Sequence, residues 1–368
     1  MSDNHTRYHL IRQGLQQLYP TKLSASQLRH LHTLALLVHG LIASAHCQLP
    51  KLAAKAPKKA KVESRIKQFS RFLDTEKITQ QTFWLPFARP LLLALSNNGQ
   101  RELKICLDGS AMGRECVALV ASVVYAGRAL PIAWLVVKGK KGHLPQQRHL
   151  ELLEMVHNLV GSASRVVVLG DGEFDGTLLL DRIKGHGWHY VVRTAKSSQL
   201  KDGDLSCNFE QLGVGPGGMV AVPQALFTAA EYGPVLAVAV WDQRYENPLH
   251  LVTNLSDADT AVEYYRLRFR IECFFSDTKT RGFRLDKSHL DEPERLSRLL
   301  LAAVLAYWWL TYLGVKGRER DWDKLVHRTE RTDLSFFQLG WRILEEFLMC
   351  GRIKEIPFAL VLNPEALF

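Results

Sequence analysis

The chain has 368 residues, of which 47% are hydrophobic and 23% are charged. This apolar content can supply a sizeable core and excludes a globally disordered chain. The 47 Lys and Arg residues outnumber the 37 Asp and Glu residues, and the resulting net charge of +10 favours a polyanionic partner, most simply nucleic acid.

The cysteines and apolar segments indicate a reducing compartment and no membrane association. Six cysteines are scattered without a Cys-x-x-Cys pair, which argues against a zinc site and a disulfide framework. The polar start, MSDNHTRYHLIRQ, does not resemble a signal peptide. The longest apolar run, residues 299–310, is shorter than the ~20 residues that cross a bilayer and predicts a buried helix. We therefore expect a cytoplasmic protein.

Residues 1–98 predict a helical DNA-binding domain. Apolar positions recur with helical spacing after Ser24 and Ser26, which are candidate N-caps. A basic stretch, residues 51–72, follows and contains a single acid, Glu63. Such a stretch can follow DNA phosphates, and the alternative is a solvated linker. The residues in it that we expect to contact DNA are Lys58, Lys59, Lys61 and Arg65.

Residues 99–197 and 248–290 predict an α/β domain that begins after the polar boundary SNNGQRE. LKICLDGS predicts a strand that ends at Asp108, and ECVALVASVVYAGRALPIAWLVV predicts two strands joined by a tight turn at Ala126-Gly127. A helix, a strand that ends at Asp171, a second helix and a further strand follow. This order predicts a mixed sheet with helices packed on it.

Two other segments complete the predicted organisation. Residues 198–247 contain short strand patterns without a clear helix, which predicts an inserted β region. Its GVGPGG run lacks the spacing of a phosphate-binding loop. Residues 291–368 predict a helical C-terminal region that begins with the buried run.

A polar stripe follows the last strand of the α/β domain. Tyr265, Arg268, Glu272 and Lys279 are separated by 3, 4 and 7 residues, so a continuous helix would place them within roughly 60° of one face. The opposite face would be apolar. By itself this pattern is typical of the solvated face of an amphipathic helix.

Two predicted strand ends suggest a role for the glutamate of this stripe. Carboxylates at the ends of neighbouring buried strands lie at the edge of a sheet, where ligands gather. Asp108 and Asp171 occupy such positions, and Glu272 would complete an oxygen-rich site for Mg²⁺ or Mn²⁺. Two ions in such a site could activate a water or a 3′-hydroxyl and stabilise the leaving oxygen of a phosphodiester.

The chain resembles the bacterial DDE insertion-sequence transposases of the cut-and-paste type related to the Tn5 and Tn10 transposases. That family carries its third acid in a Tyr-x2-Arg-x3-Glu-x6-Lys signature, whose spacing residues 265–279 reproduce in full. LDGS and GDGEFDG resemble its first and second aspartate motifs. The resemblance covers residues 103–290 and implies a ribonuclease-H-like catalytic core interrupted by the β insertion.

The resemblance also implies roles, partners and a cellular setting. Asp108, Asp171 and Glu272 would bind two metal ions, while Tyr265, Arg268 and Lys279 would position DNA. An aromatic residue of the insertion would stabilise a flipped base, and Trp241 is the candidate. The partners would be double-stranded transposon ends and target DNA, bound by a homodimer associated with the bacterial nucleoid.

Several alternatives stay open. Glu173 and Asp175 also follow the second strand and compete with Asp171 for metal. The basic turn KGKKGHLPQQR either meets DNA or is a solvated loop. The chain as a whole could instead be a nuclease or resolvase with the same fold, or a transposase-derived DNA-binding regulator.

Overall fold

The computed structural model describes residues 3–19, 22–57, 60–161, 165–326 and 334–360, so Lys58 and Lys59 lie outside the described residues. The α-helices are α1 (Asp3–Leu18), α2 (Ala25–Ser44), α3 (Leu49–Lys55), α4 (Val62–Asp74), α5 (Gln80–Phe83), α6 (Leu85–Leu95), α7 (Gln146–Val160), α8 (Thr177–Gly185), α9 (Ala258–Leu267), α10 (Arg270–Thr278), α11 (Pro293–Glu319), α12 (Asp323–Val326) and α13 (Phe336–Met349). The strands are β1 (Leu103–Met112), β2 (Cys116–Tyr125), β3 (Arg128–Lys138), β4 (Val166–Gly170), β5 (His189–Arg193), β6 (Gln199–Asp202), β7 (Leu205–Asn208), β8 (Met219–Phe227), β9 (Tyr232–Val240) and β10 (Leu249–Thr253).

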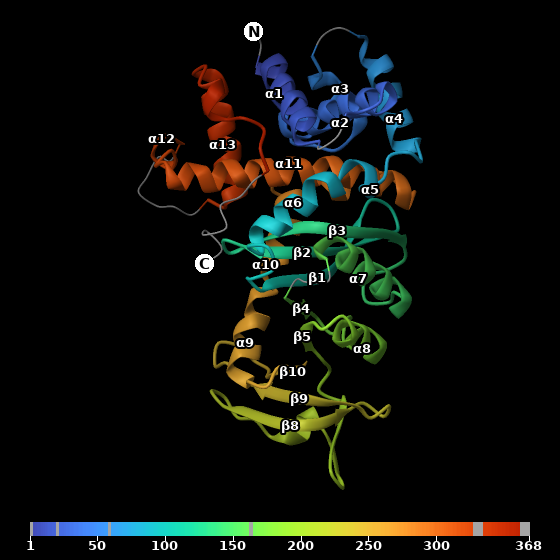
Figure 1. Ribbon diagram of the computed structural model, residues 1–368, viewed down its shortest axis with the longest axis vertical. Helices are drawn as coiled ribbons and strands as arrows, with labels where there is room; N and C mark the ends of the chain where they lie inside the picture. The colour runs from blue at the N-terminus through green and yellow to red at the C-terminus, as the bar shows by residue number, and fades with distance from the viewer. Residues whose placement is uncertain (1–2, 20–21, 58–59, 162–164, 327–333, 361–368) are drawn as a thin grey trace.

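All of these strands belong to one mixed sheet with the order β3-β2-β1-β4-β5-β10-β9-β8-β6-β7. β1, β4 and β5 are parallel, whereas β2 and β3 pair antiparallel on one side and β10 and β9 on the other. The predicted α/β class, with its strand-strand-strand-helix-strand-helix-strand order, is confirmed. The strands of residues 199–240 extend this sheet beyond β10 (Figure 1).

Local sequence explains the central strands and their connection. Every residue of β4, Val-Val-Val-Leu-Gly, is buried, as is typical of a parallel strand covered on both faces. β2 and β3 are joined by Ala126 and Gly127, whose φ angles are 44° and 70°. Positive φ at both turn residues is the geometry that closes a two-residue hairpin with the twist of the strands, and it confirms the predicted turn.

Helices cover both faces of the sheet. α7 packs against β2 and β3 and α8 against β5, whereas α9 packs against β4 and β5 and α10 against β1 and β3. Figure 1 shows α7 and α8 on one side of the strands and α9 on the other. The residues of α9 and α10 therefore lie next to β4 and β1.

The long helix α11 confirms the buried helix predicted from residues 299–310. It is the single described helix that is long and apolar enough to cross a membrane, but 89% of its apolar window is buried inside the protein. Its Trp308 donates a hydrogen bond to the Pro131 carbonyl of β3, and Trp84 donates one to the neighbouring Ile132 carbonyl. These indole contacts connect α11 and the start of α6 to the sheet.

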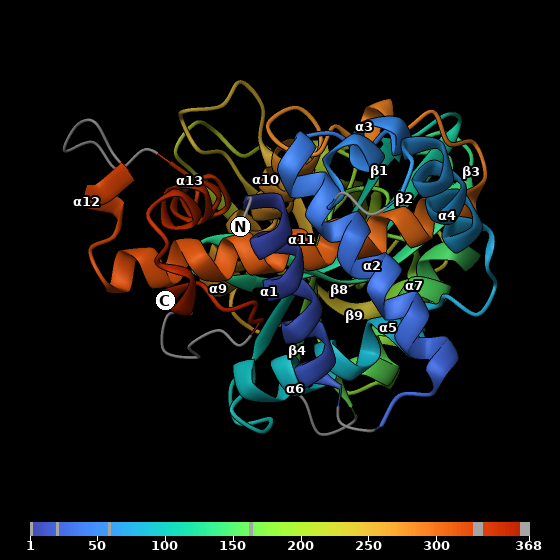
Figure 2. The ribbon, with the colours of Figure 1, turned by 90° about the horizontal axis from the view of Figure 1, so that it is seen from above.

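The N-terminal helices gather on the side of α11 away from the sheet, and Figure 2 shows α1 and α2 crossing it. α2 begins with a capping box in which the Ser24 side chain accepts from the Gln27 N–H, which confirms Ser24 as an N-cap. The buried guanidinium of Arg298 in α11 donates to the carbonyls of Leu73 and Ile78. These contacts connect the end of α4 and the segment after it to α11.

The predicted continuous helix across residues 265–279 is wrong, because the structure breaks it into α9 and α10. The break lies at Arg268 and Phe269, where the Ile271 and Glu272 N–H groups bond to carbonyls three residues earlier instead of four. This tighter turn changes the direction of the chain. α9 can then follow β4 and β5 while α10 packs across β1 and β3.

Asp277 of α10 provides a stability test of this packing. Its side chain is almost fully buried, Oδ2 has no hydrogen-bond partner, and burial raises its pKa from 3.8 to about 6. The folded state therefore binds the proton more tightly than the unfolded state, so stability falls as pH rises from about 4 to about 6. We expect Asp277→Asn to raise the free energy of unfolding at pH 8 by roughly 1–3 kcal/mol and by less at pH 5.5.

Urea unfolding at both pH values measures this difference. Asp204→Asn, in the exposed turn between β6 and β7, removes the same charge and should change stability little at either pH. An Asp277→Asn effect that is equal at both pH values, or that destabilises at pH 8, would contradict the buried-charge explanation.

Candidate active site

The two aspartates predicted at strand ends lie side by side. In the parallel β1–β4 pair, Leu107 is opposite Gly170, so Asp108 and Asp171 follow at adjacent positions on strands about 4.8 Å apart. The predicted end of β1 at Asp108 is wrong, because β1 continues to Met112 through its antiparallel pairing with β2. Only β4 ends there, which leaves the β4 side of Asp108 without a strand neighbour.

Asp108 is a buried carboxylate held by cations. Its residue is 2% exposed, and Oδ1 accepts hydrogen bonds from the Gly109 N–H at 2.7 Å and from Lys141 Nζ at 2.9 Å. Oδ2 lies 3.6 Å from Arg268 Nη1. Burial raises the pKa of Asp108, although Lys141 opposes this effect. Because the negative charge of Asp108 is buried, it requires a cationic partner nearby.

Arg268 connects Asp108 to Glu272. Its guanidinium, in a side chain that is 8% exposed, lies between Asp108 and the Glu272 Oε1 atom, which is 3.2 Å from Nη2. Glu272 itself is 56% exposed at its side chain. Asp171 acts electrostatically on both Asp108 and Arg268. The structure thus gathers the three predicted carboxylates around one arginine.

Arg268 lies among the three carboxylates, whose oxygens are not all close to one another. Within the described ranges, Asp108, Asp171 and Glu272 do not form a group whose ligand oxygens all lie within 4.8 Å of one another. Their oxygens are nevertheless the hard donors that Mg²⁺ and Mn²⁺ prefer. The donor set and the buried charge of Asp108 fit a divalent cation, which would replace the positive charge that Arg268 and Lys141 now provide.

Lys279 reaches the same strand from the end of α10. Its Nζ donates to Ser110 Oγ at 2.6 Å, and burial lowers its pKa. Because alternate residues of a strand point to the same face, Ser110 and Asp108 share one face of β1. Lys279 and Arg268 therefore place two positive charges on the side where Asp108 lies.

The two predicted aromatic residues occupy different environments. Tyr265 is 1% exposed, with its ring 5.7 Å from the Arg268 guanidinium and packed edge-on against Phe269. Trp241 follows β9, is partly exposed, and donates from its indole N–H to the Tyr245 carbonyl. Tyr265 thus belongs to the wall of the site, whereas Trp241 lies in a surface turn.

The basic N-terminal residues lie apart from this cluster. Lys61 is exposed at the start of α4, and Arg65 within α4 donates to Gln68. α4 packs against α2, α3 and α11. These two residues belong to the helical N-terminal part of the molecule, beyond α11 from the sheet (Figure 1).

Three residues near the site were missed or left open by the sequence. Lys141, in the predicted basic turn, bonds to Asp108. The Glu173 side chain is 8% exposed, lies 3.6 Å from His149 Nε2, and has no hydrogen-bond partner for either carboxylate oxygen. The motif GDGEFDG marked Glu173 as a competitor for metal, but no local pattern links it to His149, which comes from α7.

Asp175, the other residue that competes with Asp171 for metal, forms a hydrogen bond with the neighbouring strand region instead. Its Oδ2 accepts a hydrogen bond from Thr194 Oγ1 at 2.7 Å, just after β5. Burial raises its pKa. This contact fixes the loop between β4 and α8 on the neighbouring strand and helps to hold Asp171 at the end of β4.

Comparison with known proteins identifies the family of this site. The comparison with curated proteins gives no match. A solved piggyBac transposase synaptic complex with hairpin DNA aligns with a TM-score of 0.45 and 11% identity, covering 98% of this chain and 81% of that one. The family model described as the transposase DDE domain matches residues 104–309, which run from β1 into α11 and make up more than half of the chain. The protein therefore belongs to the DDE transposase family.

Proposed function

We propose that the protein is an active cut-and-paste transposase of a bacterial insertion sequence. It binds the terminal inverted repeats of its element, cleaves them and transfers their 3′ ends to target DNA. One observation carries this proposal: Asp108 within β1 lies beside Asp171 at the end of the parallel strand β4, and Arg268 connects Asp108 to Glu272. DNA binding without chemistry would not require a buried carboxylate at this position.

The residues of the site would have different roles in phosphodiester cleavage. Asp108, Asp171 and Glu272 would hold divalent cations, which when bound supply activation of the attacking oxygen and stabilisation of the leaving oxygen. Arg268 exchanges its carboxylate partners for a DNA phosphate, to which a guanidinium can donate two parallel hydrogen bonds. Lys279, held beside Asp108 through Ser110, places a second charge next to the same phosphate. Tyr265 supports Arg268 through its ring.

DNA ends are proposed to be held by the helices of residues 1–98. A groove between α2 and α4 is lined in part by Arg29, His30, His32, Gln68 and Arg71, and Lys61 and Arg65 lie at the start of α4. Such a basic groove suits phosphate contacts. Residues 99–197 and 248–290 form the catalytic unit, residues 198–247 the insertion that presents Trp241, and residues 291–368 the C-terminal region. Two protomers pair the two ends.

The first test separates binding from cleavage. We expect Glu272→Gln to bind element ends normally but to lose at least about 100-fold of its cleavage rate with Mg²⁺, because one charged metal ligand is removed. Gel shift and denaturing-gel cleavage of labelled ends measure the two properties. Glu263→Gln removes an exposed carboxylate from α9 and should keep both. Full cleavage by Glu272→Gln would refute the role of this glutamate.

The same assay distinguishes transposition from simple nuclease or resolvase activity. A transposase joins a precleaved 3′ end to target DNA, and its products on a denaturing gel are longer than the donor strand. We expect such products with the wild-type protein, and none with Glu272→Gln. Cleavage without any joined product would favour the nuclease alternative.

A second test concerns the basic segment. Each lysine that neutralises a DNA phosphate contributes about 0.9 to the slope of log K against log salt. We therefore expect the triple substitution of Lys58, Lys59 and Lys61 by Gln to weaken end binding and to lower this slope by up to about 3. Substituting the exposed Lys184, Lys324 and Lys354 removes the same charge and serves as the control. Equal slopes for the two triple variants would exclude the segment from the DNA interface.

A further inference from the structure

A second cluster of ligating side chains lies between α7 and α8, on the face of the sheet opposite α9 and α10. Glu154 and His157 are three residues apart on α7 and so share one helix face. His186 comes from the C-terminal cap of α8. One ligand atom from each residue lies within 4.8 Å of the others, and these three residues form the one such group in the described ranges.

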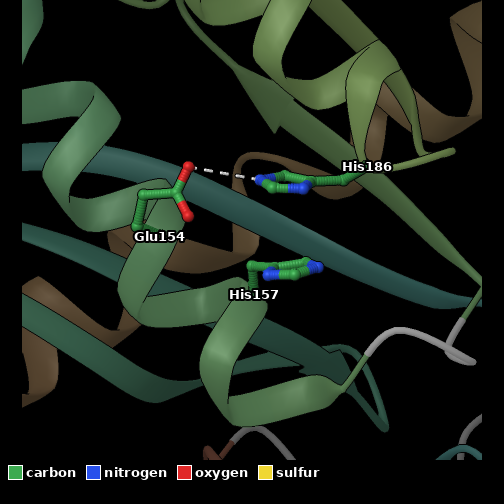
Figure 3. A group of neighbouring side chains, drawn as sticks. All are labelled: Glu154, His157 and His186. Atoms are coloured by element: carbon green, nitrogen blue, oxygen red, sulfur yellow. Dashed lines mark ion pairs between the residues drawn. The ribbon is translucent and has the colours of Figure 1, made fainter.

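The two imidazole rings are stacked, and the carboxylate lies beside one of them. Figure 3 shows the His157 and His186 rings lying parallel, with the Glu154 carboxylate beside His186. The ring centroids are 3.8 Å apart, and His186 Nε2 lies 3.4 Å from Glu154 Oε1. Trp188 packs against both rings, with centroid distances of 5.5 and 5.3 Å.

This cluster contains a buried polar atom without a partner. His186 Nε2 is shielded from solvent but has no hydrogen bond, since its approach to Glu154 does not have hydrogen-bond geometry. A buried nitrogen that is left unpaired costs free energy, and native proteins satisfy most such atoms. The atom faces the carboxylate, so a cation could bind both groups.

We propose that Glu154, His157 and His186 bind a divalent transition-metal cation such as Zn²⁺. Two imidazoles and one carboxylate are a ligand set that Zn²⁺ accepts, with a fourth position for water. The three side chains are all partly exposed, which gives such a water access. The site differs in chemistry from the all-carboxylate cluster around Asp108, which suits Mg²⁺.

The geometry requires only side-chain movement. Tetrahedral Zn²⁺ with bonds of about 2.1 Å holds its ligand atoms about 3.4 Å apart. The present separations of up to 4.8 Å can close when the two stacked rings tilt so that their nitrogens converge.

A neighbouring arginine is compatible with this site. Arg182 Nη1 donates to Glu154 Oε1, the oxygen that also faces His186. A cation would bind the second carboxylate oxygen while Arg182 orients the group, as outer-shell partners of metal ligands do. Arg182 is 51% exposed at its side chain and can turn toward solvent.

The bound ion would connect α7 to α8. α8 follows the loop that begins at Asp171, and α7 carries His149, which lies against Glu173 of that loop. A cation that binds the folded state alone stabilises it by mass action. The bound ion would therefore stabilise the packing of the two helices on the side of the sheet away from Glu272.

The test uses the full chain with Asp108→Asn, Asp171→Asn and Glu272→Gln in place, so that the carboxylate cluster cannot contribute. Titration with Co²⁺ alone should produce visible d–d absorption at one equivalent, and Zn²⁺ should abolish this absorption and raise Tm. Adding His157→Gln and His186→Gln should remove the absorption and the Tm shift. Glu154→Gln, which disturbs packing less, should raise the apparent Kd for Co²⁺ at least about tenfold.

A pair of histidines elsewhere provides the matched control. His5 and His9 on α1 approach within 3.3 Å at their Nε2 atoms, and replacing both by Gln should leave the Co²⁺ spectrum unchanged. Absence of one-equivalent binding, or a spectrum that survives both Glu154→Gln and the histidine double variant, would overturn the proposal. Tm in EDTA shows whether each variant folds. DNA cleavage is not a readout here, so this test and that of the proposed function fail independently.

Discussion

The parallel pairing of β1 with β4 is the constraint on which the candidate active site depends. Its register places Asp108 and Asp171 next to each other, and the end of β4 leaves space beside Asp108 while β1 continues along β2. A slip of one residue would turn the Asp108 side chain to the other face of the sheet. The fully buried strand β4 makes such a slip costly, because it would move its apolar residues out of their packing.

The buried charge of Asp108 explains much of the surrounding structure. A carboxylate that is 2% exposed needs positive charge nearby, and Lys141 and Arg268 provide it from a loop and from a helix break. The same arginine holds Glu272 close, so the break between α9 and α10 positions the third acid. Removing one partner of a buried pair such as Asp108 and Arg268 typically costs about 3–5 kcal/mol, so this pair helps to fix the arrangement of the site.

The unit of β4, α8 and β5 connects the two candidate metal clusters. Asp171 begins the loop before α8, and His186 ends α8. The first cluster offers oxygen ligands on one face of the sheet and the second offers mostly nitrogen ligands on the other, so their cation preferences differ. The helix between Asp171 and His186, α8, is nine residues long.

The sequence by itself determined the α/β class, the order of the central strands and helices, the Ala126-Gly127 turn and the burial of residues 299–310. These features follow from local periodicity and turn chemistry, which act over a few residues. It also singled out Asp108, Asp171 and Glu272, because residue type and spacing carry that information. Tertiary structure decided what depends on distant contacts: the continuation of β1 past Asp108, the helix break at Arg268, the bond from Lys141 to Asp108, and the meeting of His186 with α7. At Asp108, the pairing of β1 with β2 outweighs the local tendency of the strand to end. At Arg268, the packing of α9 on β4 and β5 and of α10 on β1 and β3 outweighs the local tendency to continue one helix. No local pattern could have predicted these contacts.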